Sequence, residues 1–214
     1  MTAKEFIATL KIIGQEYSKG IPKRELFSLA KEFQQMPVNE VIKLLKNENQ
    51  DYKLGAVAIL DWKARNKNTS KEERKEIYSA YIDHHKWIDN WGLVDRAAPY
   101  VVGGYLFDKD RSPLYKLAKS QNAMERRTAI VATYYFIRKN ETEDTFKIAE
   151  ILIKDTDEYV QKAVGSWIRE AGKRDEKRLK LFLDKYAGSM SRVTLRYAIE
   201  KFDQQTRKKY LRSR

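Results

Sequence analysis

Several residue types and patterns are scarce in this chain, and each absence narrows the possibilities. Cysteine is missing from the 214 residues, which excludes disulfide bonds and thiolate metal sites. Only four prolines and nine glycines occur, and strand patterns are nearly missing. No apolar run approaches the roughly 20 residues of a membrane-spanning helix. The first residues, MTAKEFIATL, lack the apolar core of a signal peptide, so we predict a cytoplasmic protein.

Charge is abundant, and bases outnumber acids. The chain has 43 Lys and Arg against 30 Asp and Glu, a formal net charge of +13. So many acids among the bases indicate helix surfaces of mixed sign with a cationic surplus. The surplus could serve solubility alone. It is also typical of proteins that bind phosphate, so a polyanion partner is the sharper hypothesis.

Helix signals recur along the whole chain. Apolar residues follow helical spacing, as in Val41, Leu44 and Leu45 or in Leu179, Phe182 and Leu183. Helix-capping patterns precede such runs. The predicted caps are Thr2 with Glu5, Ser70 with Glu73, Ser112 before Pro113, Thr156, and Ser191. The sequence therefore predicts an all-α protein.

The helices also repeat. The segments IKLLKNENQDYKLGAVAIL, YKLAKSQNAMERRTAIVAT and AEILIKDTDEYVQKAVGSW share an apolar run ending in Lys, a polar turn, and a base shortly before an alanine. The alanines are Ala56, Ala129 and Ala163, with Ala198 as a fourth, and the last three are 34 and 35 residues apart. Ala56 and Ala129 are 73 residues apart, so one unit should centre near residue 92 or 93. This period predicts an α-solenoid of HEAT-like repeats in one domain, residues 1–214.

A base recurs at one point of the second helix in successive units. The bases are Lys53, Arg126 or Arg127, Lys162 and Arg196. Stacked repeats would bring them roughly into one row along a curved face. Such a row is either an ordinary solvated face or a phosphate-binding surface, and its register with the repeat favours the second interpretation.

The stretch HHKWIDNWGLVD, residues 84–95, falls where the missing unit is expected. Trp91 and Asp95 are four residues apart and share a helix face. They are either a buried Trp beside a surface Asp or part of a site. We interpret His84 and His85 as an exposed helix end. Adjacent histidines diverge on a helix and no HExxH, Gly-rich phosphate loop or GxSxG occurs, so we expect no metal site and no cofactor.

Three runs together resemble the AlkD family of HEAT-like repeat DNA glycosylases. They are NWGLVDRAAPYVVGGYL, RRTAIVATYYF and EYVQKAVGSWIREAGKRD, and the similarity extends from Gly20 to about Phe202. The resemblance implies a right-handed solenoid that holds double-stranded DNA on a basic concave face. It also implies release of cationic N-alkylated purines such as 3-methyladenine and 7-methylguanine.

The resemblance assigns roles to particular residues. Asp95 would stabilise the positive charge that develops on the sugar, and Trp91 would form one wall around the lesion through cation–π attraction. Arg127 would bind a phosphate. The candidate DNA ligands are Lys53, Arg126, Arg127, Lys162, Arg169 and Arg196. We expect a monomer that binds DNA weakly and largely independently of sequence.

The chain departs from the AlkD pattern in two places. The family's second aromatic wall follows the Gly of its Q-K-A-I-G run, but here Ser166 holds that position and Trp167 comes one residue later. One residue is about 100° on a helix, so we expect Trp167 to turn away from the DNA. In addition, a single predicted helix, from Thr2 to Ser18, precedes the segment KGIPKREL. A shorter paralogue class of AlkD without the groove-entering helix is the better match.

Three functions remain open from the sequence. The first is an active alkylpurine DNA glycosylase, and the second is a solenoid that binds DNA weakly with little or no excision. The third is a solenoid that scaffolds proteins. Asp95 and the bases in register favour the first two, and Ser166 together with the missing groove helix favours weak or absent excision.

Overall fold

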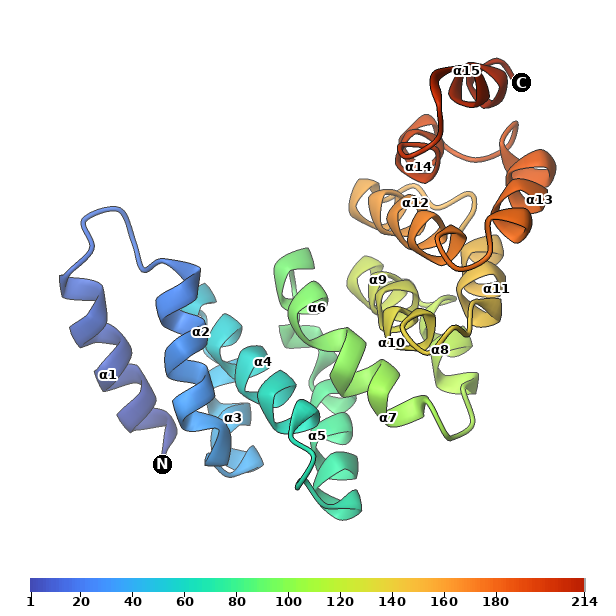
Figure 1. The fold of residues 1–214 in the computed structure, drawn as a ribbon. Coiled ribbons are helices and arrows are strands. Elements are labelled where there is room, and N and C mark those ends of the chain that lie inside the picture. Colours follow the sequence, from blue (N-terminus) through green and yellow to red (C-terminus); the bar gives the residue numbers. More distant parts are fainter. Residues whose placement is uncertain (214) are drawn as a thin grey trace. The chain divides into compact units, whose positions relative to one another are not determined.

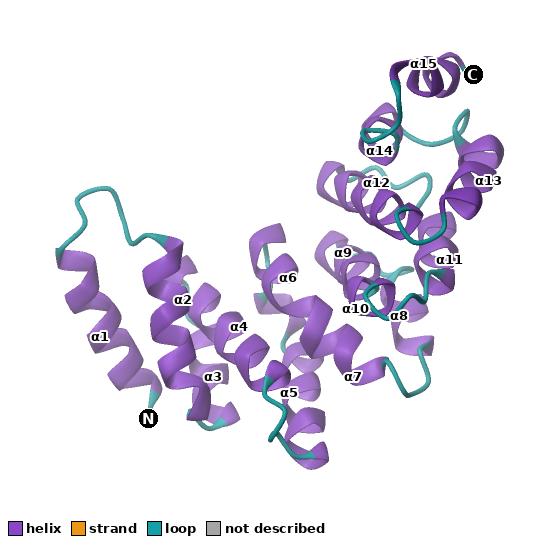
Figure 2. Cartoon of the chain, in the orientation of Figure 1, coloured by secondary structure: helices purple, strands orange, loops and turns teal. Residues whose placement is uncertain are grey.

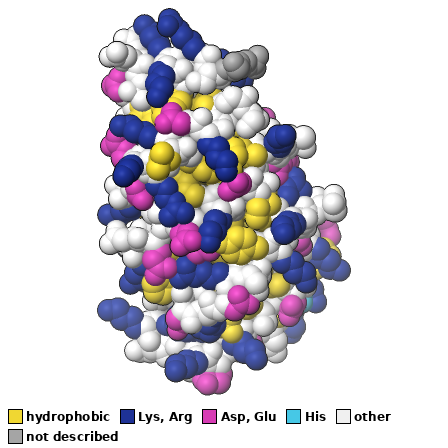
Figure 3. Space-filling model, turned by 90° about the vertical axis from the view of Figure 1, so that its right-hand side faces the viewer, with side chains coloured by type: hydrophobic (Ala, Val, Ile, Leu, Met, Phe, Trp, Pro, Cys, Tyr) yellow, Lys and Arg dark blue, Asp and Glu magenta, His cyan; other side chains and the backbone are white. Residues whose placement is uncertain are grey.

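The computed structural model describes residues 1–213, in which helices are joined by loops and turns and no β-strand occurs (Figure 2). This confirms the all-α prediction. The chain forms two compact units, Met1–Tyr105 and Leu106–Arg214. Acidic and basic side chains are interspersed over the face drawn in Figure 3, as the composition indicates.

The first unit is built from two rows of helices. Its elements are α1 (Ala3–Gln15), α2 (Lys23–Glu32), the 3₁₀ turn η1 (Phe33–Gln35), α3 (Val38–Leu45), α4 (Gln50–Arg65), α5 (Lys71–Asp83), the 3₁₀ turn η2 (His85–Trp87), α6 (Trp91–Ala98), the π-helical segment η3 (Pro99–Gly103) and α7 (Gly104–Leu106), which ends just past the unit. Helix α4 packs against both α2 and α6, and these three helices lie side by side (Figure 1). Helices α3 and α5 contact α4 and each other as the second row.

The second unit repeats this plan. Its elements are α8 (Ser112–Leu117), α9 (Ala123–Ala132), α10 (Tyr134–Ile137), α11 (Glu143–Ile151), α12 (Glu158–Gly172), α13 (Glu176–Tyr186), α14 (Arg192–Ala198) and α15 (Gln204–Arg212). Helix α12 packs between α9 and α14 (Figure 1). Helix α8 contacts α9, α11 contacts both α9 and α12, and α13 contacts α12. Helix α15 packs on α14.

The repeat alanines lie where the second helices of the pairs pack. Ala56 is in α4, Ala129 in α9, Ala163 in α12 and Ala198 in α14, and each is at most 2% exposed. A small residue is also required at Gly165 of α12, because a Cβ atom there would lie 2.4 Å from the carbonyl oxygen of Thr194 in α14. Small residues therefore let α12 and α14 approach closely. The unit expected near residue 92 or 93 is helix α6.

Most predicted caps are present. Thr2 and Glu5 form a capping box, and the side chains of Ser70 and Ser191 accept hydrogen bonds from the backbone at the third helical residue. Two predictions were wrong by a residue or two. Asp157, not Thr156, caps α12, because its carboxylate accepts from Val160 N.

Helix α8 begins after Arg111, whose side chain makes no capping hydrogen bond. The backbone N of Ser112 donates to Asp110 Oδ1 at 3.0 Å, so the aspartate, not Ser112, accepts at the start of the turn. Ser112 is itself the first helical residue.

Candidate nucleic-acid interface

Helix α6 presents Trp91 and Asp95 on one face. Asn90 begins the helix, because its side-chain oxygen accepts from Gly92 N at 2.9 Å and from Leu93 N at 3.2 Å. Trp91 follows as the first helical residue and is 44% exposed, which is unusual for an indole on a packed helix. Asp95 lies one turn later and is partly exposed. The exposure of both residues favours a site over a core packing role.

A cation already lies beside the indole of Trp91. The ammonium group of Lys23, at the first position of α2, is 6.0 Å from the ring centroid. This distance is at the outer limit of a cation–π contact. The ring face is therefore accessible to positive charge. Lys23 lies in the segment GIPKREL, but nothing in its spacing to Trp91 along the chain indicated this contact.

A buried ion cluster holds α6 against α4. Asp61 has no exposed surface, and Arg65 Nε lies 2.9 Å from its carboxylate while Arg96 Nη2 lies 3.0 Å away. Burial raises the pKa of Asp61 more than Arg96 and Arg65 lower it. Arg96 directly follows Asp95, so the ion pair orients the helix that carries Trp91 and Asp95. We refer to Asp61, Arg65 and Arg96 as the charge cluster.

Aromatic rings surround the arginines of the charge cluster. The guanidinium of Arg96 lies 4.5 Å from the ring centroid of Phe27 and 5.3 Å from that of Trp62. The guanidinium of Arg65 lies 3.7 Å from the centroid of Tyr100. These rings come from α2, α4 and η3, so the cluster joins several elements of the first unit. The sequence analysis did not identify this cluster, because the contact of Asp61 with Arg96, 35 residues away, depends on packing.

The start of α6 is also tied to α4 by polar contacts. Asn90 Nδ2 donates to Gln50 Oε1 at 2.8 Å, and Lys53 Nζ donates to Asp89 Oδ2 at 2.5 Å. Lys53 is only 3% exposed. The prediction of Lys53 as a base on an open row is therefore not supported by its geometry, because a buried ammonium group requires a carboxylate partner and Asp89 supplies it.

Two predicted arginines of α9 are committed to contacts within the second unit. Arg126 makes two hydrogen bonds to the carboxylate of Asp155, at 2.6 and 3.0 Å, and this pair raises its pKa. Arg127 is 7% exposed and donates to the backbone oxygen of Tyr159. Both side chains join α9 to the segment around the start of α12.

The other predicted bases of the second unit differ in their surroundings. Lys162 pairs with Glu158 one turn earlier on α12, at 2.6 Å, and lies 5.8 Å from the Tyr159 ring centroid. Arg169 pairs with Glu200. Arg196, on α14, is exposed, and no ion pair to it occurs within residues 1–213. Arg196 is therefore the base of the predicted set that is best placed to meet a phosphate.

The residues at the predicted second aromatic wall, Ser166 and Trp167, are less exposed than Trp91. The ring of Trp167 is 4.9 Å from that of Tyr134 on α10, and the residue is partly buried. Ser166 is also partly buried. Trp167 packs on an aromatic neighbour of the same unit, and that its ring turns away from the DNA stays a prediction.

The histidine pair was interpreted wrongly in part. His85 is 2% exposed, and its ring packs edge-on against Tyr81 at 5.5 Å. The reason is the 3₁₀ turn η2, which begins at His85 and turns the ring inward after α5 ends. Within residues 1–213, no three His, Asp or Glu side chains are grouped to hold a metal ion. The same residues contain no helix long and apolar enough to cross a bilayer.

Trp91 and Asp95 lie in the first unit, whereas Arg127 lies in the second. That the three line one site stays a prediction. The geometry places Trp91 and Asp95 one turn apart on α6, both at least partly exposed, and an exposed base, Arg196, on α14.

Three solved bacterial structures share this fold. The chain is 17% identical to AlkD2 from Streptococcus mutans, with a TM-score of 0.67, over 94% of this chain and 100% of that one. It is 16% identical to a predicted DNA alkylation repair enzyme from Enterococcus faecalis, with a TM-score of 0.65, over 94% and 95% of the two chains. A third structure, smu.31 from S. mutans UA159, is 17% identical with a TM-score of 0.63, over 92% and 100%.

No curated protein matches the sequence. The profile of the family described as "DNA alkylation repair enzyme" matches residues 2–202, nearly the whole chain. The predicted resemblance is confirmed at the level of the family. With the profile covering both units, the chain belongs to the DNA alkylation repair enzyme family.

Proposed function

We propose that this protein is a DNA-binding, HEAT-like solenoid of the AlkD type, with weak binding to double-stranded DNA and weak or absent excision of cationic alkylpurines. The observation that carries the proposal is the pair on α6: Trp91 is 44% exposed, with Asp95 one turn away and partly exposed. The proposal includes a right-handed solenoid, a single domain and a monomer that acts in the cytoplasm.

The chemistry of cationic alkylpurines suits this pair. A purine that already carries positive charge leaves without being protonated, so catalysis consists of stabilising positive charge on base and sugar. A fixed carboxylate such as Asp95 does so electrostatically, and an indole face such as that of Trp91 attracts the cationic base.

Weak DNA binding follows from the state of the predicted bases. Lys53, Arg126, Arg127 and Arg169 make contacts within the protein, so phosphates would have to compete with those contacts. Arg196 is exposed, and Lys162 has only a surface partner, Glu158. Phosphate contacts from a few such bases give affinity without base recognition.

Weak excision is supported by the second unit. A lesion held between two indoles would need a ring directly after Gly165, and Ser166 holds that position. Trp167 packs on Tyr134 at 4.9 Å instead. A cationic base would then meet one aromatic wall, Trp91, and lose part of the attraction that a second ring supplies.

The test is a single-turnover base-release assay on methylated duplex DNA, with DNA binding measured in parallel by fluorescence anisotropy. We expect measurable binding at low salt, and slow or undetectable release of 7-methylguanine. Any release should fall by about 10²–10³ in Asp95→Asn, because the variant keeps the shape but removes the charge. Asp83→Asn is the matched control, since Asp83 is an exposed carboxylate of α5 in the same unit.

Two results would contradict the proposal in different ways. Robust release that Asp95→Asn abolishes and Asp83→Asn preserves would establish an active glycosylase in place of a weak one. Absence of DNA binding even at low salt would remove the DNA function altogether and favour a protein-scaffolding solenoid.

A further inference from the structure

Helix α15 is a basic helix that follows the region matched by the family. The family profile ends at residue 202, and α15 covers Gln204–Arg212. Its nine residues contain four bases and no acid. The bases are Arg207, Lys208, Lys209 and Arg212. Lys and Arg side chains gather at the top of the view in Figure 3, at the height of α15 in Figure 1.

One side of α15 is fixed to the rest of the second unit. Tyr210 is 2% exposed, and its ring stacks on Phe202 with centroids 6.1 Å apart. The Tyr210 hydroxyl donates to the backbone oxygen of Lys180 at 3.5 Å, and Arg192 of α14 donates to the backbone oxygen of Leu211 at 2.8 Å. The helix is thereby held in place, and all of its fully exposed residues are polar.

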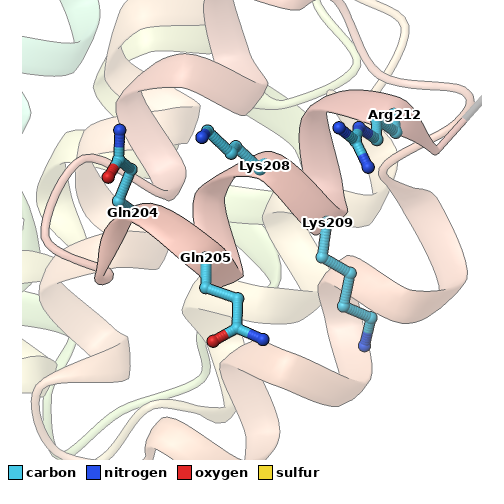
Figure 4. A pocket seen from close by; sticks show the side chains of 5 residues that line it. All are labelled: Gln204, Gln205, Lys208, Lys209 and Arg212. Atoms are coloured by element: carbon cyan, nitrogen blue, oxygen red, sulfur yellow. The ribbon is translucent and has the colours of Figure 1, made fainter.

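The polar surface carries an ordered row. Gln204, Lys208 and Arg212 are spaced by four residues, which places neighbouring members about 6 Å apart along the helix. Their side chains extend from the same side of α15, whereas Gln205 and Lys209 extend from another, and the five line one open pocket (Figure 4). We refer to Gln204, Lys208 and Arg212 as the α15 row.

The charges of the α15 row are available. Lys209, outside the row, lies 3.3 Å from a carboxylate oxygen of Asp184. Lys208 and Arg212 are exposed, and within residues 1–213 neither forms an ion pair. The ammonium group of Lys208 and the guanidinium of Arg212 are hydrogen-bond donors only, and the amide of Gln204 can also donate. Three donors in a line suit a row of anionic oxygens.

We propose that the α15 row binds the phosphate backbone of duplex DNA, as a contact additional to those of the family's repeats. The inference rests on the DNA binding proposed above and adds a second surface to it. A lipid headgroup offers similar oxygens, but a helix that binds a bilayer also inserts an apolar face. Tyr210 of α15 is buried on Phe202, Leu211 is only partly exposed, and every fully exposed residue of the helix is polar, so α15 has no broad apolar face for insertion. A duplex requires only the charges.

The test compares the salt dependence of DNA binding in two double variants. Lys208→Gln with Arg212→Gln removes both charges of the row without touching Tyr210. Lys43→Gln with Lys147→Gln is the matched control, because it removes two exposed lysine charges that already have carboxylate partners, Glu40 and Glu143. Circular dichroism checks that both variants are folded.

We expect the row variant to lower the slope of log affinity against log salt by nearly two, about 0.9 for each phosphate that the protein no longer neutralises. The control should change the slope by much less. If the wild type binds duplex DNA and the row variant keeps its slope, the assignment of α15 to DNA is wrong while the proposed function stands. If the wild type does not bind DNA, both proposals fall. Preferential loss of binding to phosphatidylserine–phosphatidylcholine vesicles, with DNA binding intact, would overturn the assignment to DNA.

Discussion

The bases of the packed helices differ in exposure, and Lys53 in the first unit and Arg196 in the second are the two extremes among the predicted DNA ligands. In the first unit, Lys53 and Lys63 of α4 are 3% and 5% exposed, and each faces a carboxylate, Asp89 at 2.5 Å and Glu73 at 2.7 Å. In the second unit, Arg196 of α14 is exposed to solvent. Lys53 and Arg196 were predicted from the same register of the repeat, yet one is an internal ion-pair partner and the other a surface charge.

The difference shows what decides whether a base can bind phosphate. A buried charge is stable only with a partner of opposite charge. A base that pairs with a buried or half-buried aspartate is therefore not available to bind phosphate. Asp89 plays that part for Lys53 because η2 and the cap of α6 bring it against α4. The register of a repeat therefore predicts the position of a base on its helix. The neighbouring segment determines whether that base forms an internal ion pair or stays exposed.

The largest expected effect is on the charge cluster of the first unit. Asp61→Asn leaves Arg65 and Arg96 without a carboxylate beside α4, and breaking a buried ion pair by removing one partner costs about 3 kcal/mol or more. We expect a loss of that size in the free energy of unfolding, measured by urea denaturation with circular dichroism.

The control is Glu143→Gln, which breaks an exposed pair with Lys147 at 2.6 Å in the second unit. Exposed pairs of this kind contribute about 0.5 kcal/mol or less. Equal destabilisation by the two variants would contradict this prediction, because the buried charge cluster would then contribute no more to stability than an exposed ion pair.

The features that local sequence encodes were predicted well. Helix periodicity and side-chain caps act within one or two turns, and a repeat spacing needs only the order of residues. For this reason the helical class, the capping box of Thr2 and Glu5, and the recurrence of Ala129, Ala163 and Ala198 on successive repeat helices could all be predicted.

The candidate site was predictable only in part. The spacing of Trp91 and Asp95 places them on one helix face, and their exposure agrees with a site. The partners of Lys53, Arg96 and His85 could not be predicted, because they come from residues 4 to 36 positions away through packing and a 3₁₀ turn. Contacts of this kind are set by tertiary structure, and the sequence carries no local signal for them.

A smaller effect is expected at the ion pair of Lys53, with a defined pH dependence. Partial burial raises the pKa of Asp89, but its hydrogen bond with Lys53 and the charge of Lys53 outweigh this, so the pKa is lowered from 3.8. The stabilisation is therefore present above about pH 4 and is lost as the pH falls through the lowered value. We expect Asp89→Asn to cost about 1.5 kcal/mol at pH 7, since Lys53 loses a charged hydrogen-bond partner.

The difference between wild type and Asp89→Asn should begin to shrink below about pH 4, where Asp89 of the unfolded chain takes up a proton, and should disappear once the pH is below the lowered pKa of the folded protein. Urea denaturation at pH 7 and at pH 3 measures this difference. Glu176→Gln, which removes an exposed partner of Lys180, serves as the comparison. A difference that is the same at both pH values would show that Asp89 acts through shape and not through its charge.

The smallest expected effect separates the two bases that share a repeat register. Arg196→Gln should lower the slope of log affinity for duplex DNA against log salt by about one, because one phosphate is no longer neutralised. Lys53→Met combined with Asp89→Asn removes the buried pair without leaving a lone charge and keeps the net charge of the protein. Its slope should equal that of the wild type, since the ammonium group of Lys53 is 3% exposed and paired. Arg196→Lys should retain the slope, which distinguishes charge from side-chain shape. A double variant that lowers the slope as much as Arg196→Gln would show that Lys53 leaves Asp89 to meet the DNA, and the two units would then use their bases alike.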